Sequence, residues 1–141
     1  MPICTPVSAA RAAQIGPVDG PDVVYAVLSP RSARLTKERA WMLLLTRDKW
    51  LAVDSEIGRG IDDEVEIDLD WALSCVRRPE TPYCVLAHNH PSGSAWPSWQ
   101  DARLTREMGR AAWAQGVELL DHVVLGRGEF FSFHHQKGAR A

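Results

Sequence analysis

Residues 83–90 (YCVLAHNH) constrain the fold of this chain more than any other segment. The segment begins with apolar residues, ends in three polar ones, and is followed by the turn signature Pro91-Ser92-Gly93. A continuous apolar run of this length is typical of a strand buried on both faces in the middle of a sheet. Its polar end leaves the core, so we expect a functional site at that end of the sheet.

The rest of the chain alternates between helical and strand patterns. Helical periodicity is present over residues 21–38, 68–78 and 98–115. Pro30 kinks or ends the first of these helices, or lies in the first turn of a second one. Strand patterns occupy residues 39–46, 50–55, 83–90, 117–125 and 130–134. This order predicts a mixed α/β (α+β) sandwich and not a doubly wound nucleotide-binding fold.

The composition fits one globular domain with its own core. The chain has 141 residues, of which 45% are hydrophobic and 24% are charged. Its net charge is −2, whereas a domain that neutralises nucleic-acid phosphates usually has a basic excess. The sequence contains no apolar run of the roughly 18–20 residues that a membrane span needs, and its first residues do not resemble a signal peptide.

The three cysteines, Cys4, Cys75 and Cys84, are irregularly spaced and form no Cys-x-x-Cys motif. Their odd number argues against a disulfide framework and favours a reducing, cytoplasmic setting. Cys84 lies inside the apolar run over residues 83–90, so we expect it to be a core residue.

The polar end of this run has the spacing of a metal site. His88 and His90 are two residues apart, so both imidazoles project from the same face of a strand. Asp101 falls in the first turn of the next expected helix, and the intervening turn can bring its carboxylate to the same ion. Two nitrogens and one oxygen leave a fourth tetrahedral position for water, as in a catalytic zinc site. The pattern predicts one Zn²⁺ per chain.

Hydrolysis at such a site also needs a proton carrier and a donor to the developing oxyanion. Glu56 is our candidate for the proton carrier, because it ends a strand of the expected sheet. Ser98 is our candidate for the oxyanion donor, because it begins the helix that carries Asp101.

Each of these residues also has an ordinary structural interpretation. The histidines could simply be polar residues that end a strand, and Glu56 could be a solvated surface acid. Ser98 and Asp101 also have the spacing of a helix capping box, which is compatible with the metal site. We favour the metal site because one short segment supplies all the ligands in order.

The segment resembles the JAMM motif of the MPN+ (JAB) metalloprotease superfamily, which has an upstream Glu, His-x-His, seven residues and Ser-x-x-Asp. It is most similar to the RadC-like branch. The shared wording is AHNHPSG at residues 87–93, LDH at 120–122, a Gly-rich turn at 126–128 and FSF at 131–133. The resemblance implies an MPN/JAB fold of cytidine-deaminase-like architecture, in which helices sandwich a curled mixed sheet. It also implies zinc held by His88, His90 and Asp101, with Glu56 as the general acid/base and Ser98 steadying the intermediate.

The resemblance covers about residues 21–135. We therefore expect a RadC-like JAB/MPN domain there, a flexible N-terminal arm over residues 1–20 and a C-terminal tail over residues 136–141. The chain has no room for the helix-hairpin-helix region of longer RadC-like proteins, so it resembles the short members that consist of a JAB domain only. Ile61 stands where Thr is usual in the family, a departure that bears on substrate contacts more than on zinc.

The resemblance implies a zinc-dependent metallohydrolase of the peptidase or isopeptidase type. Its substrate would be a protein or peptide, with a ubiquitin-like tail as one candidate. Two alternatives stay open: a non-catalytic MPN-type binding module, and a DNA-repair-associated RadC-like protein whose DNA binding the net charge does not favour. A zinc deaminase is excluded because the Pro-Cys-x-x-Cys signature is missing. The sequence does not define the oligomeric state.

Two further features have two interpretations each. His122 is either a buried core histidine or, with Asp121, a residue that orients a ligand imidazole. Trp96 and Trp99 either line a substrate groove or only pack against the domain.

Overall fold

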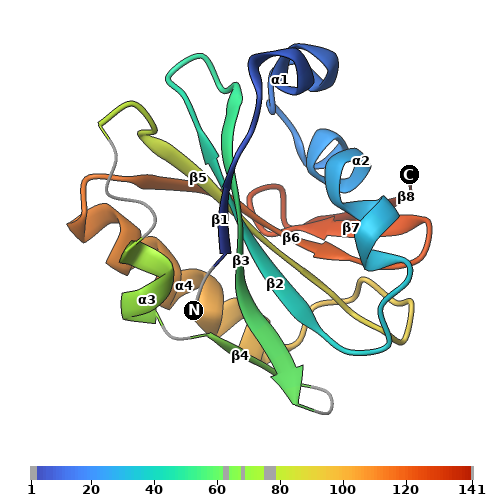
Figure 1. The fold of residues 1–141 in the computed structure, drawn as a ribbon. Helices are drawn as coiled ribbons and strands as arrows, with labels where there is room; N and C mark the ends of the chain where they lie inside the picture. The colour runs from blue at the N-terminus through green and yellow to red at the C-terminus, as the bar shows by residue number, and fades with distance from the viewer. Residues whose placement is uncertain (1–2, 62–63, 68, 75–78, 141) are drawn as a thin grey trace.

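The structure is a computed structural model that describes residues 3–61, 64–67, 69–74 and 79–140 (Figure 1). The helices are α1 (Ala9–Ile15), α2 (Pro21–Ser32), α3 (Leu69–Ser74) and α4 (Trp99–Ala114). The strands are β1 (Ile3–Pro6), β2 (Arg39–Leu45), β3 (Leu51–Ile61), β4 (Glu64–Ile67), β5 (Tyr83–Asn89), β6 (Glu118–Leu125), β7 (Glu129–Ser132) and β8 (Lys137–Arg140). They form one sheet in the order β1-β3-β2-β5-β6-β7-β8, with β4 also paired to β3.

Strand β5 lies in the middle of this sheet, as its apolar sequence predicts. It pairs antiparallel with β2 and parallel with β6, so the sheet is mixed. A parallel pair needs a crossover connection, and α4 supplies it between β5 and β6. This topology places the carboxyl end of β5, where the two histidines lie, close to the beginning of α4.

Helices cover both faces of the sheet (Figure 1). On one face, Val24, Val27 and Leu28 of α2 pack against alternate side chains of β2, β5 and β6. On the other face, the remaining side chains of β2 and β5 pack against Met108 and Ala112 of α4 and against α3. The predicted mixed sheet sandwiched between helices is confirmed.

Both ends of the chain contain more regular structure than the sequence indicated. Residues 1–20 were expected to form a flexible arm, yet they contain β1, which pairs with β3, and α1. Ser8 caps α1 by accepting a hydrogen bond from the backbone N–H of Arg11 at 3.2 Å. The expected tail over residues 136–141 contains β8, which pairs with β7. Edge pairing of this kind depends on backbone hydrogen bonds, so side-chain periodicity predicts it poorly.

Several element boundaries also differ from those predicted. The helix expected over residues 21–38 ends at Ser32, and Pro30 lies inside it without ending it. Strand β3 continues to Ile61 instead of ending at residue 55. The helix expected over residues 68–78 is present as α3; residues 68 and 75–78 lie outside the described residues.

The prediction for Cys84 is confirmed, whereas the expectation that the cysteines form no disulfide is wrong for Cys4. Cys84 is a free thiol buried in the core, as expected, and burial raises its pKa to about 12. Cys4 is disulfide-bonded, although the cysteine pattern did not favour a disulfide. Cys75 lies outside the described residues. Within the part of the chain that is described, every helix is too short or too polar to cross a lipid bilayer.

Replacing Leu86 by alanine tests the central position of β5. Leu86 is fully buried in the core beneath α3 and α4, so Leu86→Ala should lower the free energy of unfolding by about 2–5 kcal/mol. Denaturant titration measures this loss. Trp113→Ala is the control, because Trp113 is 71% exposed and its replacement should cost about 0.5 kcal/mol or less. Equal losses in the two variants would contradict this assignment of the core.

Candidate metal centre

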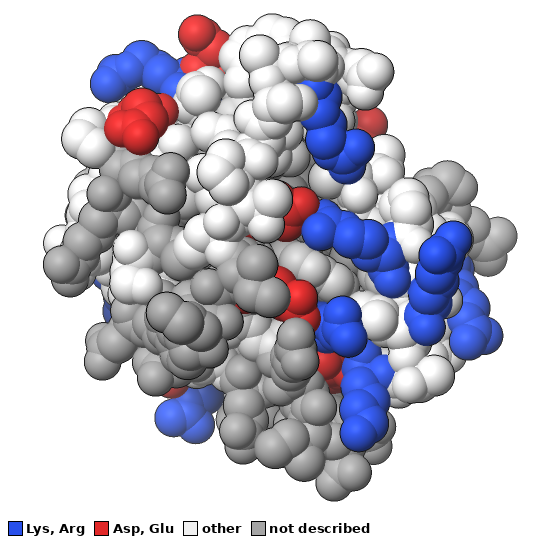
Figure 2. Space-filling view, in the orientation of Figure 1, with Lys and Arg blue, Asp and Glu red and all other residues white. Residues whose placement is uncertain are grey.

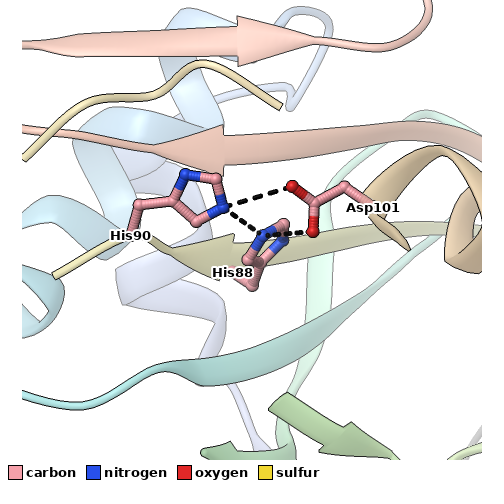
Figure 3. A group of neighbouring side chains, drawn as sticks. All are labelled: His88, His90 and Asp101. Carbon is pink, nitrogen blue, oxygen red and sulfur yellow. Dashed lines mark hydrogen bonds and ion pairs between the residues drawn. The ribbon is translucent and has the colours of Figure 1, made fainter. Parts of the chain in front are cut away.

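His88, His90 and Asp101 meet at the carboxyl end of β5 (Figure 3). His88 is fully buried near the end of β5, and His90 follows one residue after the strand ends. Asp101 reaches them from the first turn of α4 and is 7% exposed. The crossover therefore brings together the three side chains that the sequence predicts as ligands.

The distances among these side chains fit one small cation. His88 Nε2 lies 3.1 Å from Asp101 Oδ1, and His90 Nε2 lies 3.2 Å from Asp101 Oδ2. The two Nε2 atoms are 3.0 Å apart. Ligands about 2.05 Å from a tetrahedral zinc ion would be separated by about 3.3 Å, so only small shifts are needed. Two imidazole nitrogens and one carboxylate oxygen are also a donor set that zinc prefers.

Backbone groups orient two of these side chains. The Nδ1–H of His90 donates to the carbonyl oxygen of Ser94 at 3.0 Å, since a carbonyl can only accept. Asp101 is held by the capping box of α4. Its Oδ2 accepts from the Ser98 N–H at 2.8 Å, and its own N–H donates to Ser98 Oγ at 3.1 Å. The capping interpretation of this pair is therefore correct, and Asp101 also lies beside both histidines, so the two interpretations are compatible, as the sequence allowed.

His88 is oriented by another side chain. Its Nδ1 lies 2.7 Å from Nε2 of His122 in β6, and Nδ1 of His122 lies 2.6 Å from Thr105 Oγ1 in α4. His122 is fully buried. The carboxylate of Asp121 does not take part, because it accepts from Ser132 Oγ and from backbone N–H groups of His122 and His134. Of the two candidates for orienting a ligand, the structure places His122 in that position.

The local electrostatics separate the two metal-facing histidines. Burial lowers the pKa of His88 below its ordinary value. Burial acts in the same direction on His90, but the hydrogen bond and charge of Asp101 outweigh it and raise the pKa of His90. Although burial opposes ionisation of Asp101, its close contacts with both histidines and the hydrogen bond from the Ser98 backbone lower the pKa of its carboxyl group. The carboxylate is thus ionised at neutral pH, as a metal ligand must be.

An open groove of about 730 Å³ runs past this cluster. His90, Ser98 and Asp101 lie in its wall, together with Glu38. Glu38 directly precedes β2 and is only 9% exposed, and its negative charge contributes to the raised pKa of His90. Glu38 is therefore an acidic side chain beside the cluster that is not one of the three ligands.

Glu56 is not brought to the cluster. It pairs across the sheet with Trp41, whose side chain packs on the α2 side. Its neighbours Val53 and Ile57 point to the opposite side, where Ala40 and its partner His88 also face. Glu56 Oε1 lies 3.5 Å from Nε of Arg39. The candidate proton carrier is thus wrong in position, because a strand alternates its side chains between two faces.

Trp96 and Trp99 were candidates for lining a substrate groove, but neither belongs to the wall of the groove beside the cluster. Trp96 is 76% exposed and Trp99 is 69% exposed, and neither is among the described residues of the groove wall. Trp96 makes an edge contact with Phe131, with ring centroids 6.2 Å apart. They flank Ser98 in sequence but lie on the outer surface.

Comparison with known proteins then defines the family. The family model described as the RadC-like JAB domain matches residues 18–139. The chain belongs to the RadC-like JAB domain family. The match includes both histidines, Asp101, Glu38 and His122, and the resemblance noted in the sequence is confirmed.

Several relatives of this RadC-like JAB domain are UPF0758 proteins. One from Symbiobacterium thermophilum is 34% identical over 130 residues, which is 90% of this chain and 55% of the relative. Another, from Porphyromonas gingivalis, is 34% identical over 112 residues, which is 79% of this chain and 49% of the relative. The chain thus spans about half the length of these relatives.

Sequence reasoning missed Glu38 and Thr105 in this RadC-like domain. Thr105 lies four residues after Asp101, and that spacing places both on one face of a helix, so a local signal existed. Glu38 had no such signal. Its place beside His90 depends on β2 pairing with β5, with Ala40 opposite His88.

The buried histidines make a prediction about pH. His88 and His122 have pKa values below their ordinary 6.5, so the metal-free fold loses stability as pH falls below 6.5 and the unfolded chain takes up protons. His90, whose pKa is raised, is protonated in both states below 6.5 and adds no slope there. The free energy of unfolding should fall between pH 6.5 and 5 by up to about 1.4 kcal/mol per pH unit for each buried histidine.

Urea titrations in the presence of a chelator measure this slope. His135→Asn, at an exposed position, is the control and should leave the slope unchanged. A stability that stays flat or rises over this pH range would show that the two histidines are not held neutral.

Proposed function

We propose that this RadC-like JAB domain is a zinc-dependent metallohydrolase that cleaves peptide or isopeptide bonds. The observation that carries the proposal is the convergence of His88, His90 and Asp101 beside an open groove, whose wall contains His90, Asp101 and Glu38. A closed structural site would use a fourth protein ligand and would not need a groove or a nearby acid. A non-catalytic binding module is therefore the weaker interpretation.

The three ligands would hold the zinc ion through His88 Nε2, His90 Nε2 and a carboxylate oxygen of Asp101. A zinc ion held there would polarise a substrate carbonyl and make a water molecule more acidic. Glu38 would take the proton from that water and deliver it to the leaving amine, because it is an acid beside the ligands and is not itself a ligand. Glu38 thus replaces Glu56 as the proposed general acid/base.

Ser98 is suited to steady the developing oxyanion. Its Oγ accepts a hydrogen bond from the Asp101 N–H, so its own hydroxyl hydrogen can be donated to another oxygen. Ser98 also lies in the groove wall. A donor aimed at a developing negative charge lowers the barrier for acyl transfer.

The lining of the groove favours a polypeptide as the substrate. Ile67, Leu69 and Leu104 provide apolar surface, and Glu38 and Glu107 provide charge. An extended peptide presents both apolar side chains and polar backbone groups, so it matches such a wall. A flexible protein tail, of which a ubiquitin-like tail is one candidate, could reach the cluster along this groove.

Replacing Glu38 and Glu56 by glutamine separates the two candidate acids. Glu38→Gln should lower hydrolysis of an internally quenched peptide library or an isopeptide-linked ubiquitin-like fusion by about 100-fold or more, because the proton carrier is lost. Zinc content, measured by atomic emission, should stay at one per chain. Glu56→Gln is the matched control and should keep both activity and zinc. Full activity in Glu38→Gln, or loss of activity in Glu56→Gln alone, would contradict the assignment.

DNA association is a second candidate that one observation favours. Lys and Arg side chains gather toward one side of the molecule (Figure 2). In the sequence, four of the basic residues lie within nine positions: Arg31, Arg34, Lys37 and Arg39. Arg31 and Arg39, however, are paired with Asp54 and Glu56. Binding to duplex DNA that weakens steeply with salt would support this candidate, and binding with no salt dependence would argue against it.

A further inference from the structure

The imidazole ring of His122 is fixed by contacts at both of its nitrogens and on its face. It is fully buried in β6, and both of its ring nitrogens have a side-chain partner, His88 on one side and Thr105 on the other. The ring of Phe133 stacks on it with centroids 5.0 Å apart and an interplanar angle of 17°. Its ring plane and both nitrogen positions are therefore fixed.

The direction of the protons follows from the outer end of this line. Thr105 Oγ1 donates to the carbonyl oxygen of Asp101 at 2.8 Å, because a carbonyl can only accept. Its lone pairs are then available to accept from the Nδ1–H of His122 at 2.6 Å. A neutral His122 that carries its proton on Nδ1 has a lone pair on Nε2.

That lone pair fixes the tautomer of His88. Nε2 of His122 lies 2.7 Å from Nδ1 of His88, so Nδ1 of His88 must carry the proton that joins them. A neutral His88 protonated on Nδ1 has its lone pair on Nε2. Nε2 is the atom that faces Asp101 at 3.1 Å, and it is the one a cation would use.

Hydrogen bonds donated in the opposite direction along Thr105, His122 and His88 would leave no lone pair on His88 Nε2 for a metal ion. If the Thr105 hydroxyl donated to His122 instead, every proton along the line would shift, and His88 would carry its proton on Nε2. A protonated imidazole nitrogen cannot bind a metal. His90 meets the inner end of this line, because its Nε2 lies 3.0 Å from Nε2 of His88, while its own Nδ1 proton is held by the carbonyl oxygen of Ser94.

We propose that His122 and Thr105 are positioning residues that hold His88 as the Nδ1–H tautomer, with Nε2 of His88 directed toward Asp101 to receive a metal ion. The inference rests on the proposed function for the identity of the ion. The line of hydrogen bonds joins β5, β6 and α4, and it ends on the backbone of Asp101, a second ligand. It therefore fixes the position of His88 relative to Asp101, which are two of the three ligands.

The hydroxyl of Thr105 can be removed without changing the size of the side chain. Thr105→Val loses the hydroxyl and leaves the Nδ1–H of His122 without an acceptor, whereas Thr105→Ser keeps it. We expect the zinc dissociation constant, measured by competition with a chromophoric chelator, to rise about 10- to 100-fold in Thr105→Val. In Thr105→Ser it should stay within about threefold of the wild-type value, a range well below the usual effect of losing such a partner.

A second measurement does not depend on zinc. Long-range ¹H–¹⁵N correlation spectra of the chelator-treated protein report which ring nitrogen of each histidine is protonated. In the wild type we expect Nδ1–H for both His88 and His122, and in Thr105→Val we expect a shift toward Nε2–H for both. A merely structural role for Thr105 would not move these tautomers.

The outcomes separate this inference from the proposed function. Wild-type protein that binds no zinc but shows both Nδ1–H tautomers would overturn the metallohydrolase and leave the positioning role supported. Unchanged zinc affinity and unchanged tautomers in Thr105→Val would overturn the positioning role, as would equal weakening in Thr105→Ser and Thr105→Val. If Thr105→Val does not fold, an Nε2–H tautomer of either histidine in the wild type is the overturning result.

Discussion

The burial of His88 is the constraint on which the rest of the site depends. A fully buried imidazole is stable only when both ring nitrogens have partners, since an unpaired buried polar group is costly. His122 accepts the Nδ1 proton, and the Nε2 lone pair faces Nε2 of His90 at 3.0 Å and Asp101 Oδ1 at 3.1 Å, at the point where a cation would be held. These partners come from a parallel neighbour strand, from the helix that crosses between the two strands and from the residue just beyond the strand end. The need to satisfy one ring therefore explains why the cluster forms where β5, β6 and α4 meet.

The sheet also separates the site from an unrelated set of charges. The α2 side carries Asp54 and Glu56 paired with Arg31 and Arg39, while the other side carries the histidines and the groove. Glu38 lies in the groove wall because it precedes β2, so its side chain does not follow the alternation between two faces that a strand imposes. Glu38 thus lies near the ligands without being one of the three side chains that would hold the ion. This position suits a group that exchanges protons with a substrate in the groove.

The sequence predicted those parts of the site that depend on local geometry. The His-x-His spacing needs only a strand, and the Ser-x-x-Asp spacing needs only a helix beginning, so both predictions are correct in placing these side chains together. The assignment of Glu56 failed because it required the register of three paired strands, and the bulge near Ala40 changes that register. Glu38 could not be found for the same reason, since only the pairing of Ala40 with His88 brings it near. The mixed sheet between helices was predicted, whereas β1 and β8 were missed because they are short edge strands.

Diffraction from crystals grown with zinc, recorded on both sides of the zinc absorption edge, tests the central claim most directly. The account predicts one anomalous peak per chain, about 2.0–2.2 Å from His88 Nε2, His90 Nε2 and a carboxylate oxygen of Asp101, with its open side toward the groove and Glu38. A map with no peak between these three side chains, or a peak held by a fourth protein ligand that closes the site, would contradict it.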